Sequence, residues 1–509
     1  MQKVIVIGGG LAGLTVAKRL TEAGLEPQIY EARDRLGGRV LTSKSATTGQ
    51  AIDLGPSWYW PQIQEEFDSL ITELELNSFP QHDEGEVLHL TDPEEGTTNA
   101  GTDPVHGGAY RLEGGMAELI DALAATIAPQ SITLNAVLQE IEDCTTHIRL
   151  SFNTSDGIKE VLSDRVVLAI PPRVLAENVR FVPELPESLH SVMTNTSTWM
   201  AAEAKAVICY PRAGWRDEGL SGSAFVAHER VVLNEIFDQS AADGTPGALG
   251  GFLALGPTHR AEFSTGLTML VENQFQQIFG ESAENGELVM QDWSQEPFTC
   301  SALDISGGPA ERRPAHPLLR RAFWNGRLHL AGTETARAHP GHMAGAVESA
   351  DRVAQRLLQD TMPAPYGDLG DWFLEHAEQT FDTYRQTLNR LLSQQRPREV
   401  TRLATQDSVA ALLDDALDYV QHHLDSAEPA TQSGAVSLDQ AKPALHATLN
   451  RVIGQIIGFN RSSCALRNFP TEHELPESYI RLILQDASTL GRGFLNDMDA
   501  LLAAHGGKA

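Results

Sequence analysis

Cysteine is scarce in this sequence of 509 residues, and the four that occur are far apart: Cys144, Cys209, Cys300 and Cys464. No two of them form a CxxC pair, so the spacing predicts neither a zinc site nor a disulfide framework. We therefore expect no metal ion and a reducing environment, which indicates a cytoplasmic protein.

Long apolar runs and basic residues are also lacking. No stretch approaches the roughly 20 apolar residues of a membrane-spanning helix, and no signal-peptide pattern precedes the first predicted strand. The chain has 38 Lys and Arg residues against 68 Asp and Glu, a formal net charge of −30. Such a surface repels nucleic acid and anionic membranes, so neither is expected as a partner. The charge favours solubility, and it can also attract a cationic substrate.

Apolar residues are nevertheless plentiful, at 41% of the chain, which is typical of a soluble globular protein. A buried strand over 4–7, apolar residues at helical spacing over 14–23 and a strand over 26–30 predict the opening β-α-β unit of a doubly wound sheet. Two further buried strands, over 165–170 and 327–332, are expected to join the same sheet.

The predicted fold class is α/β, with a Rossmann-like nucleotide-binding domain, an inserted mixed α+β substrate domain and an all-helical C-terminal domain. The predicted boundaries are 1–60, 126–199 and 291–360 for the first, 61–125 and 200–290 for the second, and 366–509 for the third. The third contains several stripes of apolar residues at helical spacing. Those stripes would pack on the rest of the protein, or they would bind a partner or a second copy in a homo-oligomer.

A glycine-rich turn, Gly8-Gly9-Gly10-Leu11-Ala12-Gly13, joins the first predicted strand to the first helix. Gly8 permits the tight turn, Gly10 lets the backbone approach a pyrophosphate, and Gly13 lets the helix pack closely on the strand. Glu31 follows at the end of the second strand, where a carboxylate accepts hydrogen bonds from ribose hydroxyls. This arrangement predicts a dinucleotide site without distinguishing NAD from FAD.

The segment from Glu31 to Arg39 extends this pattern to E-A-x-x-x-x-G-G-R. Arg39 would place a positive charge beside the pyrophosphate, and Gly37-Gly38 would let the backbone pass close by. Together with the glycine turn, the segment resembles the flavin-containing amine oxidase family, which includes monoamine, polyamine and L-amino-acid oxidases. The resemblance implies FAD, although phytoene desaturases and protoporphyrinogen oxidases share much of the pattern.

The resemblance continues through Asp53-Leu54-Gly55-Pro56-Ser57-Trp58 and Gly114-Gly115-Met116 to strings at 331–336 and 341–346. It implies that FAD is bound by Gly8, Gly10, Gly13, Glu31, Ala32, Arg33, Gly38, Arg39, Gly55, Ser57, Val137, Trp293, Gly332, Thr333, Gly341 and Met343. The helix that begins near Gly341 would direct its positive end at the flavin and stabilise the anionic reduced form. Ordinary turn chemistry for the later glycines, and a purely structural role for Trp293, are the alternatives.

Lys205 lies where these oxidases place a lysine that holds a water against flavin N5, and a cation there would assist oxygen reduction or imine hydrolysis. The alternative is a surface lysine on a strand. The resemblance also implies a substrate pocket containing Trp58, Leu303 and His342. Monoamine oxidases enclose the amine between two aromatic rings at the positions of Leu303 and His342. Ordinary monoamines are therefore not expected as substrates here. His342 would instead accept a proton, orient a polar substrate or hydrogen-bond to the flavin edge.

Monoamine oxidases attach FAD through a cysteine, and Ala302 stands at the aligned position. Non-covalent FAD is therefore expected, with Cys300, two residues away, as the alternative attachment site. The glycine and arginine motifs described above would hold the cofactor through its phosphates without a covalent bond.

The resemblance implies an FAD-dependent oxidase. A hydride would pass from the C–H beside an amine nitrogen to flavin N5, giving an imine, and oxygen as the electron acceptor would give hydrogen peroxide. The substrate would be a small molecule, and the acidic surface favours a cationic amine. Two alternatives stay open: a flavin desaturase or dehydrogenase acting on a non-amine substrate, and an interaction protein that keeps FAD for structure and acts through its helical tail.

Overall fold

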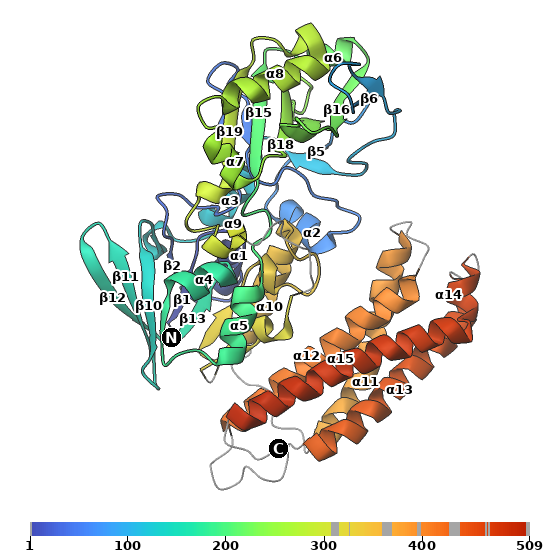
Figure 1. Cartoon of the computed structure of the whole chain (residues 1–509). Coiled ribbons are helices and arrows are strands. Elements are labelled where there is room, and N and C mark those ends of the chain that lie inside the picture. The colour runs from blue at the N-terminus through green and yellow to red at the C-terminus, as the bar shows by residue number, and fades with distance from the viewer. Residues whose placement is uncertain are drawn as a thin grey trace. The chain divides into compact units, whose positions relative to one another are not determined.

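The computed structural model describes residues 3–306, 315–324, 326–358, 369–393, 399–426, 438–463, 466 and 469–504. The chain divides into two compact units, whose elements are labelled in Figure 1. One unit comprises Met1–Arg320 and Gly326–Leu358, and the other comprises Arg321–Asn325 and Gln359–Ala509. The first unit combines helices with several sheets, so the predicted α/β class is confirmed.

A parallel sheet forms the centre of the first unit, with strands in the order β21-β13-β1-β2-β9. The strands are β1 (Val4–Ile7), β2 (Gln28–Tyr30), β9 (Ile132–Thr133), β13 (Arg165–Leu168) and β21 (Leu328–Leu330). β1 is completely buried, as a parallel strand covered on both faces requires. From β1 the chain continues to β2 on one side, whereas β13 lies on the other, so the strand order reverses between β1 and β13.

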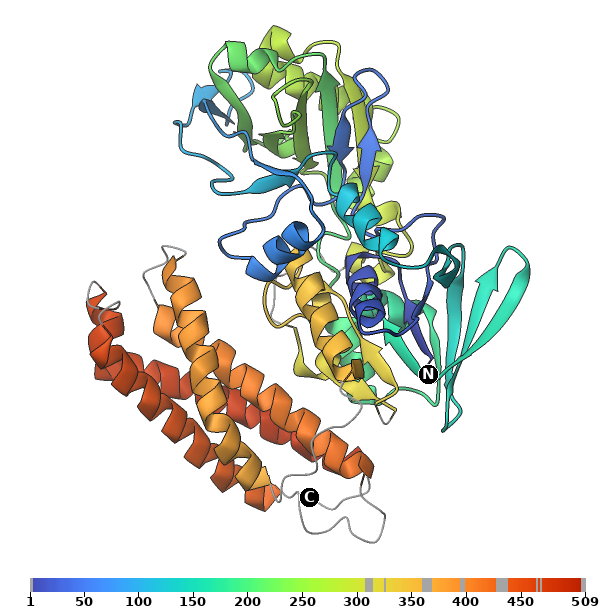
Figure 2. The same ribbon diagram turned by 180° about the vertical axis from the view of Figure 1, so that it is seen from behind.

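Helices cover this sheet and share one apolar core with it. They are α1 (Leu11–Glu22), α2 (Glu65–Glu73), α3 (Ala117–Ala125) and α10 (Met343–Leu358). Figure 2 shows α10 beside α1. The predicted boundary places all of 61–125 in the inserted domain, but Phe67, Leu70 and Leu119 are fully buried in this core. This difference arises because the apolar stripes of α2 and α3 need a partner surface, and α1 and α10 supply it.

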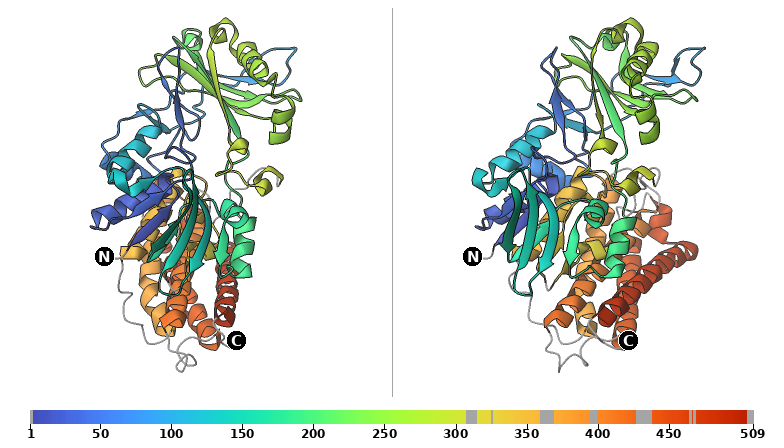
Figure 3. Two further views of the ribbon diagram at one scale, coloured as in Figure 1. Left: turned by 90° about the vertical axis from the view of Figure 1, so that its left-hand side faces the viewer. Right: turned by 60° about the vertical axis from the view of Figure 1, so that its left-hand side comes forward.

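A four-stranded sheet with the order β12-β11-β10-β14 lies beside the parallel sheet (Figure 3). Its strands are β10 (Val137–Asp143), β11 (Ile148–Thr154), β12 (Gly157–Ser163) and β14 (Arg180–Val182), and two helices follow nearby in the chain, α4 (Pro172–Asn178) and α5 (Glu187–Asn195). The ring of Tyr30 on β2 stacks on Phe152 of β11 with 4.4 Å between centroids. This contact joins the two sheets.

The third large sheet has seven strands in the order β19-β15-β18-β17-β16-β6-β7. Its strands are β6 (Glu86–Leu90), β7 (Thr98–Asn99), β15 (Ala204–Tyr210), β16 (Leu220–Val226), β17 (Leu233–Asp238), β18 (Gly247–Leu253) and β19 (Glu287–Asp292). Trp215 of α6 (Gly214–Asp217) and Phe275 of α8 (Leu267–Phe279) are buried in the core that forms around it. The smaller elements are β3 (Thr42–Lys44), β4 (Ala51–Asp53), β5 (Ser78–Pro80), β8 (Tyr110–Leu112), α7 (Pro257–Glu262) and α9 (Ala302–Ser306).

The second unit carries the short strand β20 (Ala322–Phe323) and, in its described part from residue 369 onward, helices. These are α11 (Leu369–Ser393), α12 (Val400–Ser426), α13 (Leu438–Ser462), α14 (Pro470–Glu474) and α15 (Glu477–Ala504). Residues such as Phe373, Leu413 and Phe494 meet in one core, so the long helices bury one another's apolar faces. Within the parts of the chain that the structure describes, no helix combines the length and apolar character needed to cross a bilayer.

Candidate active site

A cavity of about 810 Å³ lies at the carboxyl edge of the parallel sheet. Residues that follow each strand line it: Gly8 after β1, Glu31 after β2, Ala136 after β9, Ala169 after β13 and Gly332 after β21. Ligands of doubly wound sheets bind at this edge, where the strand order reverses. The volume lies in the ordinary range for ligand pockets, roughly 300–1,000 Å³.

The glycine turn after β1 leaves room for a phosphate. Gly8 has a φ of +104°, and a Cβ there would lie 2.5 Å from the Ala169 carbonyl oxygen. A Cβ on Gly13 would lie 2.0 Å from the Gly8 carbonyl oxygen, so Gly13 permits the close approach of α1 and does not itself line the cavity. A Cβ on Gly10 would meet no atom closer than 3.8 Å and would take up space inside the cavity. The turn and the N-terminus of α1 therefore fit a pyrophosphate.

Glu31 binds the backbone of the glycine turn. It is 4% exposed, and its carboxylate accepts hydrogen bonds from the Gly9 N–H at 2.6 Å and from the Arg33 N–H at 2.9 Å. The residue also lines the cavity, where the expected ribose contact would be made. Glu31 thus has a second role that the sequence did not indicate, because it holds the turn after β1 against the end of β2.

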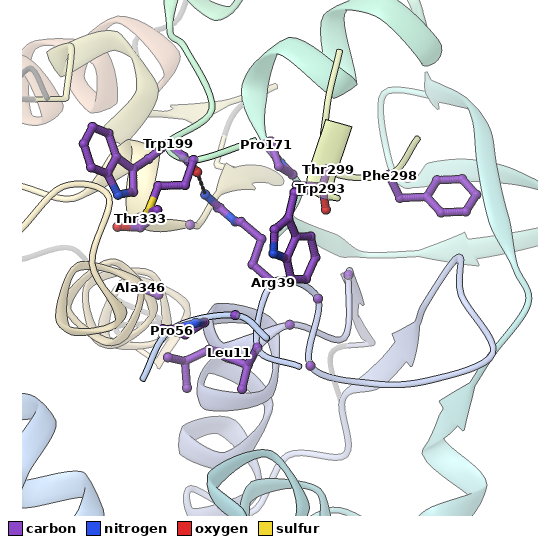
Figure 4. Close-up of a pocket in the computed structure, with 18 of the residues that line it drawn as sticks. Leu11, Arg39, Pro56, Pro171, Trp199, Trp293, Phe298, Thr299, Thr333 and Ala346 are labelled. Atoms are coloured by element: carbon purple, nitrogen blue, oxygen red, sulfur yellow. Dashed lines mark hydrogen bonds between the residues drawn. The ribbon is translucent and has the colours of Figure 1, made fainter. Parts of the chain in front are cut away.

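Arg39 is paired with a carboxylate from a distant segment. Its guanidinium donates two hydrogen bonds to Glu334, at 2.6 and 2.9 Å, and one to the Trp199 carbonyl at 3.4 Å. Burial opposes the charge, but the Glu334 carboxylate outweighs burial and raises the Arg39 pKa. Figure 4 shows Arg39 with Trp199, Trp293 and Thr333 around the cavity. Glu334 is a site residue that sequence reasoning missed, although it lies within the string at 331–336.

Arg33 orders another part of the wall. Its guanidinium donates to Glu296 at 2.9 and 3.0 Å and to the Thr299 hydroxyl at 2.8 Å. The same guanidinium lies 5.5 Å from the ring centroid of Phe298. Phe298, Thr299 and Val137 line the cavity together with Arg33, so this part of the wall is held in place by protein contacts.

Lys205 is buried on β15 and is not a surface lysine. It is 2% exposed and lines the cavity. Its ammonium donates to the Gly55 carbonyl at 3.0 Å and to the Ser57 hydroxyl at 2.6 Å. The Ser57 hydroxyl also accepts a hydrogen bond from the Gln239 side chain at 2.8 Å. Lys205 is therefore joined to the Asp53–Trp58 segment that the sequence analysis assigned to the flavin.

The rest of the Lys205 environment is aromatic. Three ring centroids lie between 5.2 and 5.8 Å from Nζ, those of Trp58, Phe237 and Phe252. Burial lowers the Lys205 pKa to about 7, although the nearby Asp53 carboxylate acts in the opposite direction. The ammonium therefore changes charge near neutral pH, as groups at catalytic sites often do.

The N-terminus of α10 faces the cavity. Gly341, His342 and Met343, at the start of this helix, line the cavity, so the positive end of the helix is directed at a bound ligand. Gly341 has a φ of +82°, and a Cβ there would lie 2.8 Å from the Trp199 ring. Trp293, also on the wall, is 6% exposed, and its indole N–H donates to the Leu54 carbonyl at 3.0 Å.

The structure brings most of the predicted site residues to this one cavity. The lining includes Gly8, Gly10, Glu31, Ala32, Arg33, Gly38, Arg39, Gly55, Ser57, Trp58, Val137, Lys205, Trp293, Gly332, Thr333, Gly341, His342 and Met343. Leu303 is not among the lining residues and is 45% exposed. The prediction that Leu303 lines the substrate pocket is therefore wrong. In α9, its side chain is exposed to solvent.

The seven-stranded sheet and nearby loops supply a further part of the wall, with residues that the sequence analysis did not select. They include His106, Asn234, Glu235 and Phe252. Trp58 stacks on His106 with 4.1 Å between centroids, and its indole N–H donates to Gln81 at 2.9 Å. Sheet pairing and loops bring these residues together from distant segments, so no local pattern could have indicated them.

The family model for flavin-containing amine oxidoreductases matches residues 11–102 and 97–358, which is more than half of the chain. The chain belongs to this family. It is an FAD-dependent oxidoreductase, and the match ends with α10, before the helices of the second unit.

This amine oxidoreductase is similar to several named oxidases. Amine oxidase B of Sus scrofa is 23% identical over 455 residues, covering 70% of this chain and 86% of the relative. A probable flavin-containing monoamine oxidase A of Dictyostelium discoideum is 25% identical over 460 residues, covering 70% of this chain and 97% of the relative. Among solved structures, putrescine oxidase bound to putrescine has a TM-score of 0.56 at 20% identity, covering 70% of this chain and 99% of its own. Cyclohexylamine oxidase from Brevibacterium oxydans IH-35A has a TM-score of 0.56 at 19% identity, with the same coverage.

The amine oxidoreductase binds its FAD non-covalently. Of the cysteines in the described residues, Cys144, Cys209 and Cys300, none lines the cavity, and Cys464 lies outside the described residues. Burial raises the Cys300 pKa to about 11, so this thiol is not a nucleophile near neutral pH. In the same described residues, no group of three His, Cys, Asp or Glu side chains could hold a metal ion.

Glu31→Gln should weaken FAD binding by about 10- to 100-fold, because hydrogen bonds to a charged group contribute roughly 1.5–3 kcal/mol. The amide keeps the shape but loses the charge and one of the two acceptor atoms that hold the Gly9 and Arg33 N–H groups. FAD dissociation constants of the apoprotein, measured by flavin fluorescence, check this. Glu26→Gln, in the exposed loop before β2, is the matched control and should bind FAD as the wild type does. Equal affinity in both variants would contradict the anchoring role of Glu31.

Proposed function

We propose that this amine oxidoreductase oxidises a small aliphatic amine that carries a positive charge. Bound FAD would supply the redox chemistry, in which a hydride leaves the C–H beside the amine nitrogen to give an imine and oxygen is reduced to hydrogen peroxide. The observation that carries the proposal is the buried Lys205 ammonium, which lies on the wall of the same cavity as the dinucleotide-binding turn.

Each part of the chain has a role in this proposal. The glycine turn after β1 would hold the pyrophosphate, Glu31 would accept hydrogen bonds from the ribose, and the N-terminus of α10 would face the flavin. Lys205 would hold a water beside the bound flavin and would supply positive charge where oxygen acquires negative charge. The geometry of Ser57 and Gly55 fixes the direction of its ammonium.

The wall from the seven-stranded sheet suits a cationic amine. Its lining includes Glu235, Trp58 and Phe252, and both a carboxylate and an aromatic ring attract a cation. A small alkyl amine is also what the structural relative putrescine oxidase was solved with. His342, which lines the cavity, would orient the amine or accept a proton from it.

Anaerobic bleaching of the flavin tests the proposal. The purified yellow protein is mixed without oxygen with alkyl amines, diamines and amino acids, and the long-wavelength flavin band is followed. We expect an alkyl amine to bleach the band, and admission of air to restore it with formation of hydrogen peroxide. A flavin that dithionite reduces but that no amine bleaches would contradict the proposal and favour a desaturase or dehydrogenase with a non-amine substrate.

A further inference from the structure

Three ionisable side chains meet beside the cavity, at the edge of the seven-stranded sheet. Nε2 of His106 lies 3.2 Å from Oε1 of Glu235, and Nδ1 of His106 lies 3.9 Å from Oδ1 of Asp83. The other Asp83 oxygen accepts a hydrogen bond from the His106 backbone N–H at 2.9 Å. These residues form one Asp83–His106–Glu235 cluster.

The inner part of the cluster is buried and its outer part is open. Asp83 and His106 are each 8% exposed, whereas the Glu235 side chain is 33% exposed. Both His106 and Glu235 line the cavity. Trp58 stacks on the His106 ring, and Phe237 meets the ring edge-on at 5.9 Å between centroids. The imidazole is thus held in place, and the Glu235 carboxylate is accessible to a ligand.

Sheet register sets the distance between this cluster and Lys205. Glu235 on β17 and Lys205 on β15 both pair with Phe252 of β18, which lies between them. Neighbouring strands are about 4.8 Å apart, so the Cα atoms of Glu235 and Lys205 are separated by roughly 10 Å. Residues paired across antiparallel strands point to the same face, and all three line the cavity.

The charges in the cluster do not cancel. With His106 protonated, two carboxylates and one imidazolium leave one net negative charge. Burial alone would lower the His106 pKa, but the Asp83 and Glu235 carboxylates outweigh burial and raise it. These two are the charged groups that face the ring, while Trp58 and Phe237 cover it and Lys205 lies beyond them. Without the Asp83 charge, His106 and Glu235 would form a neutral pair with little attraction for another cation.

We propose that Asp83 and His106 keep a net negative charge at the Glu235 side of the cavity, so that this enzyme selects amines bearing a second positive charge. This inference rests on the proposed function, because the reacting amine must lie at the Lys205 end of the cavity. The spacing set by the sheet suits a short aliphatic chain with a nitrogen at each end. When His106 loses its proton, the net charge changes from −1 to −2, and the selection becomes stronger.

The test compares pentane-1,5-diamine with pentylamine as substrates of the FAD-loaded full chain. The measured quantity is the ratio of the two kcat/KM values, in which effects common to both substrates, such as the titration of Lys205, cancel. We expect Glu235→Gln to lower the ratio at least about tenfold, through KM of the diamine, and Asp83→Asn to lower it about fivefold. In Asp83→Asn, whose side chain does not line the cavity, kcat for pentylamine should stay within about twofold of the wild type. Glu94→Gln, at a side chain that is 82% exposed, is the matched control and should leave the ratio unchanged.

The pH dependence of the ratio in His106→Gln separates a role of the His106 charge from a merely structural role. In the wild type the ratio should rise as the pH is raised above the ordinary range of a histidine, because the Asp83 and Glu235 carboxylates raise the His106 pKa and the proton is lost only there. In His106→Gln, whose cluster charge is always −2, the ratio should stay at the high value and should not vary with pH. An unchanged ratio in Glu235→Gln, or a flat wild-type profile, overturns the inference while leaving amine oxidation intact. A wild type that oxidises neither amine overturns the proposed function as well.

Discussion

Replacing Lys205 by methionine should slow the reoxidation of the reduced enzyme by oxygen by about 100-fold or more, the usual effect of removing one preorganised electrostatic group from an active site. Oxygen reduction builds negative charge, and the Lys205 ammonium is the cation that hydrogen bonds to Gly55 and Ser57 hold on the cavity wall. Methionine has a similar length and suits the aromatic surroundings, so the fold should be kept. Stopped-flow mixing of dithionite-reduced enzyme with oxygenated buffer measures the rate.

Two further measurements separate this charge effect from a loss of structure. FAD content should be unchanged in Lys205→Met, because the Ser57 hydroxyl keeps its hydrogen bond from Gln239. Lys44→Met, at an exposed position on β3, repeats the same substitution and should reoxidise at the wild-type rate. Wild-type reoxidation in Lys205→Met would show that the ammonium has no part in the reaction with oxygen.

The same residue predicts a pH dependence. Since burial lowers the Lys205 pKa to about 7, the side chain is charged below that pH and neutral above it. A reaction that depends on the cation should therefore slow as the pH is raised through neutrality. We expect this step in the reoxidation rate of the wild type and its absence in Lys205→Met, measured between about pH 6 and pH 9. A step that is retained in the variant would have to come from another group.

Gly13→Ala should produce a protein that no longer retains FAD. A Cβ at this position would lie 2.0 Å from the Gly8 carbonyl oxygen and 3.3 Å from the Ala169 side chain. The contact atom is backbone, so the turn after β1 or the start of α1 must move, and both shape the phosphate end of the cavity. The purified variant should be colourless after gel filtration, and its thermal unfolding temperature should be lower.

Gly458→Ala makes the same change where there is room for it. This glycine lies in α13, and a Cβ there would meet no atom within 4 Å. Alanine stabilises an exposed helix interior by up to about 1 kcal/mol relative to glycine, so FAD content should be that of the wild type. Normal yellow protein from Gly13→Ala would contradict this prediction, because it would show that the turn can shift without losing FAD.

The sequence allowed the cofactor end of the cavity to be predicted well, because that end is built locally. Gly8, Gly10 and Glu31 act through backbone turns that follow directly after strands, and a turn of this kind leaves a pattern in neighbouring residues. The family resemblance extended the prediction to Arg39 and Lys205. Even here the ion-pair partner of Arg39 was missed. Glu334 lies far along the chain from Arg39, and their contact depends on tertiary packing.

The substrate end could not be predicted in the same way. Glu235 on β17 and Lys205 on β15 line the same cavity because both pair with Phe252 of β18, the strand between them. One sequence does not specify the order of strands in an antiparallel sheet. His106 and Asp83 reach the same place from loops. The error at Leu303 also concerns tertiary structure, since no residue of α9 lines the cavity and the lining of this segment ends at Thr299.

The discontinuous construction of the parallel sheet also bears on how the enzyme acquires its cofactor during synthesis. Gly8 leaves the ribosome early, but β21 and the N-terminus of α10, which complete the same cavity, follow more than 300 residues later. A nascent chain therefore cannot close the FAD site until about residue 358 has emerged, by which point the seven-stranded sheet has been made. Domains fold in the order in which they are synthesised, so flavin loading should be a late event, coinciding with the synthesis of the C-terminal helices.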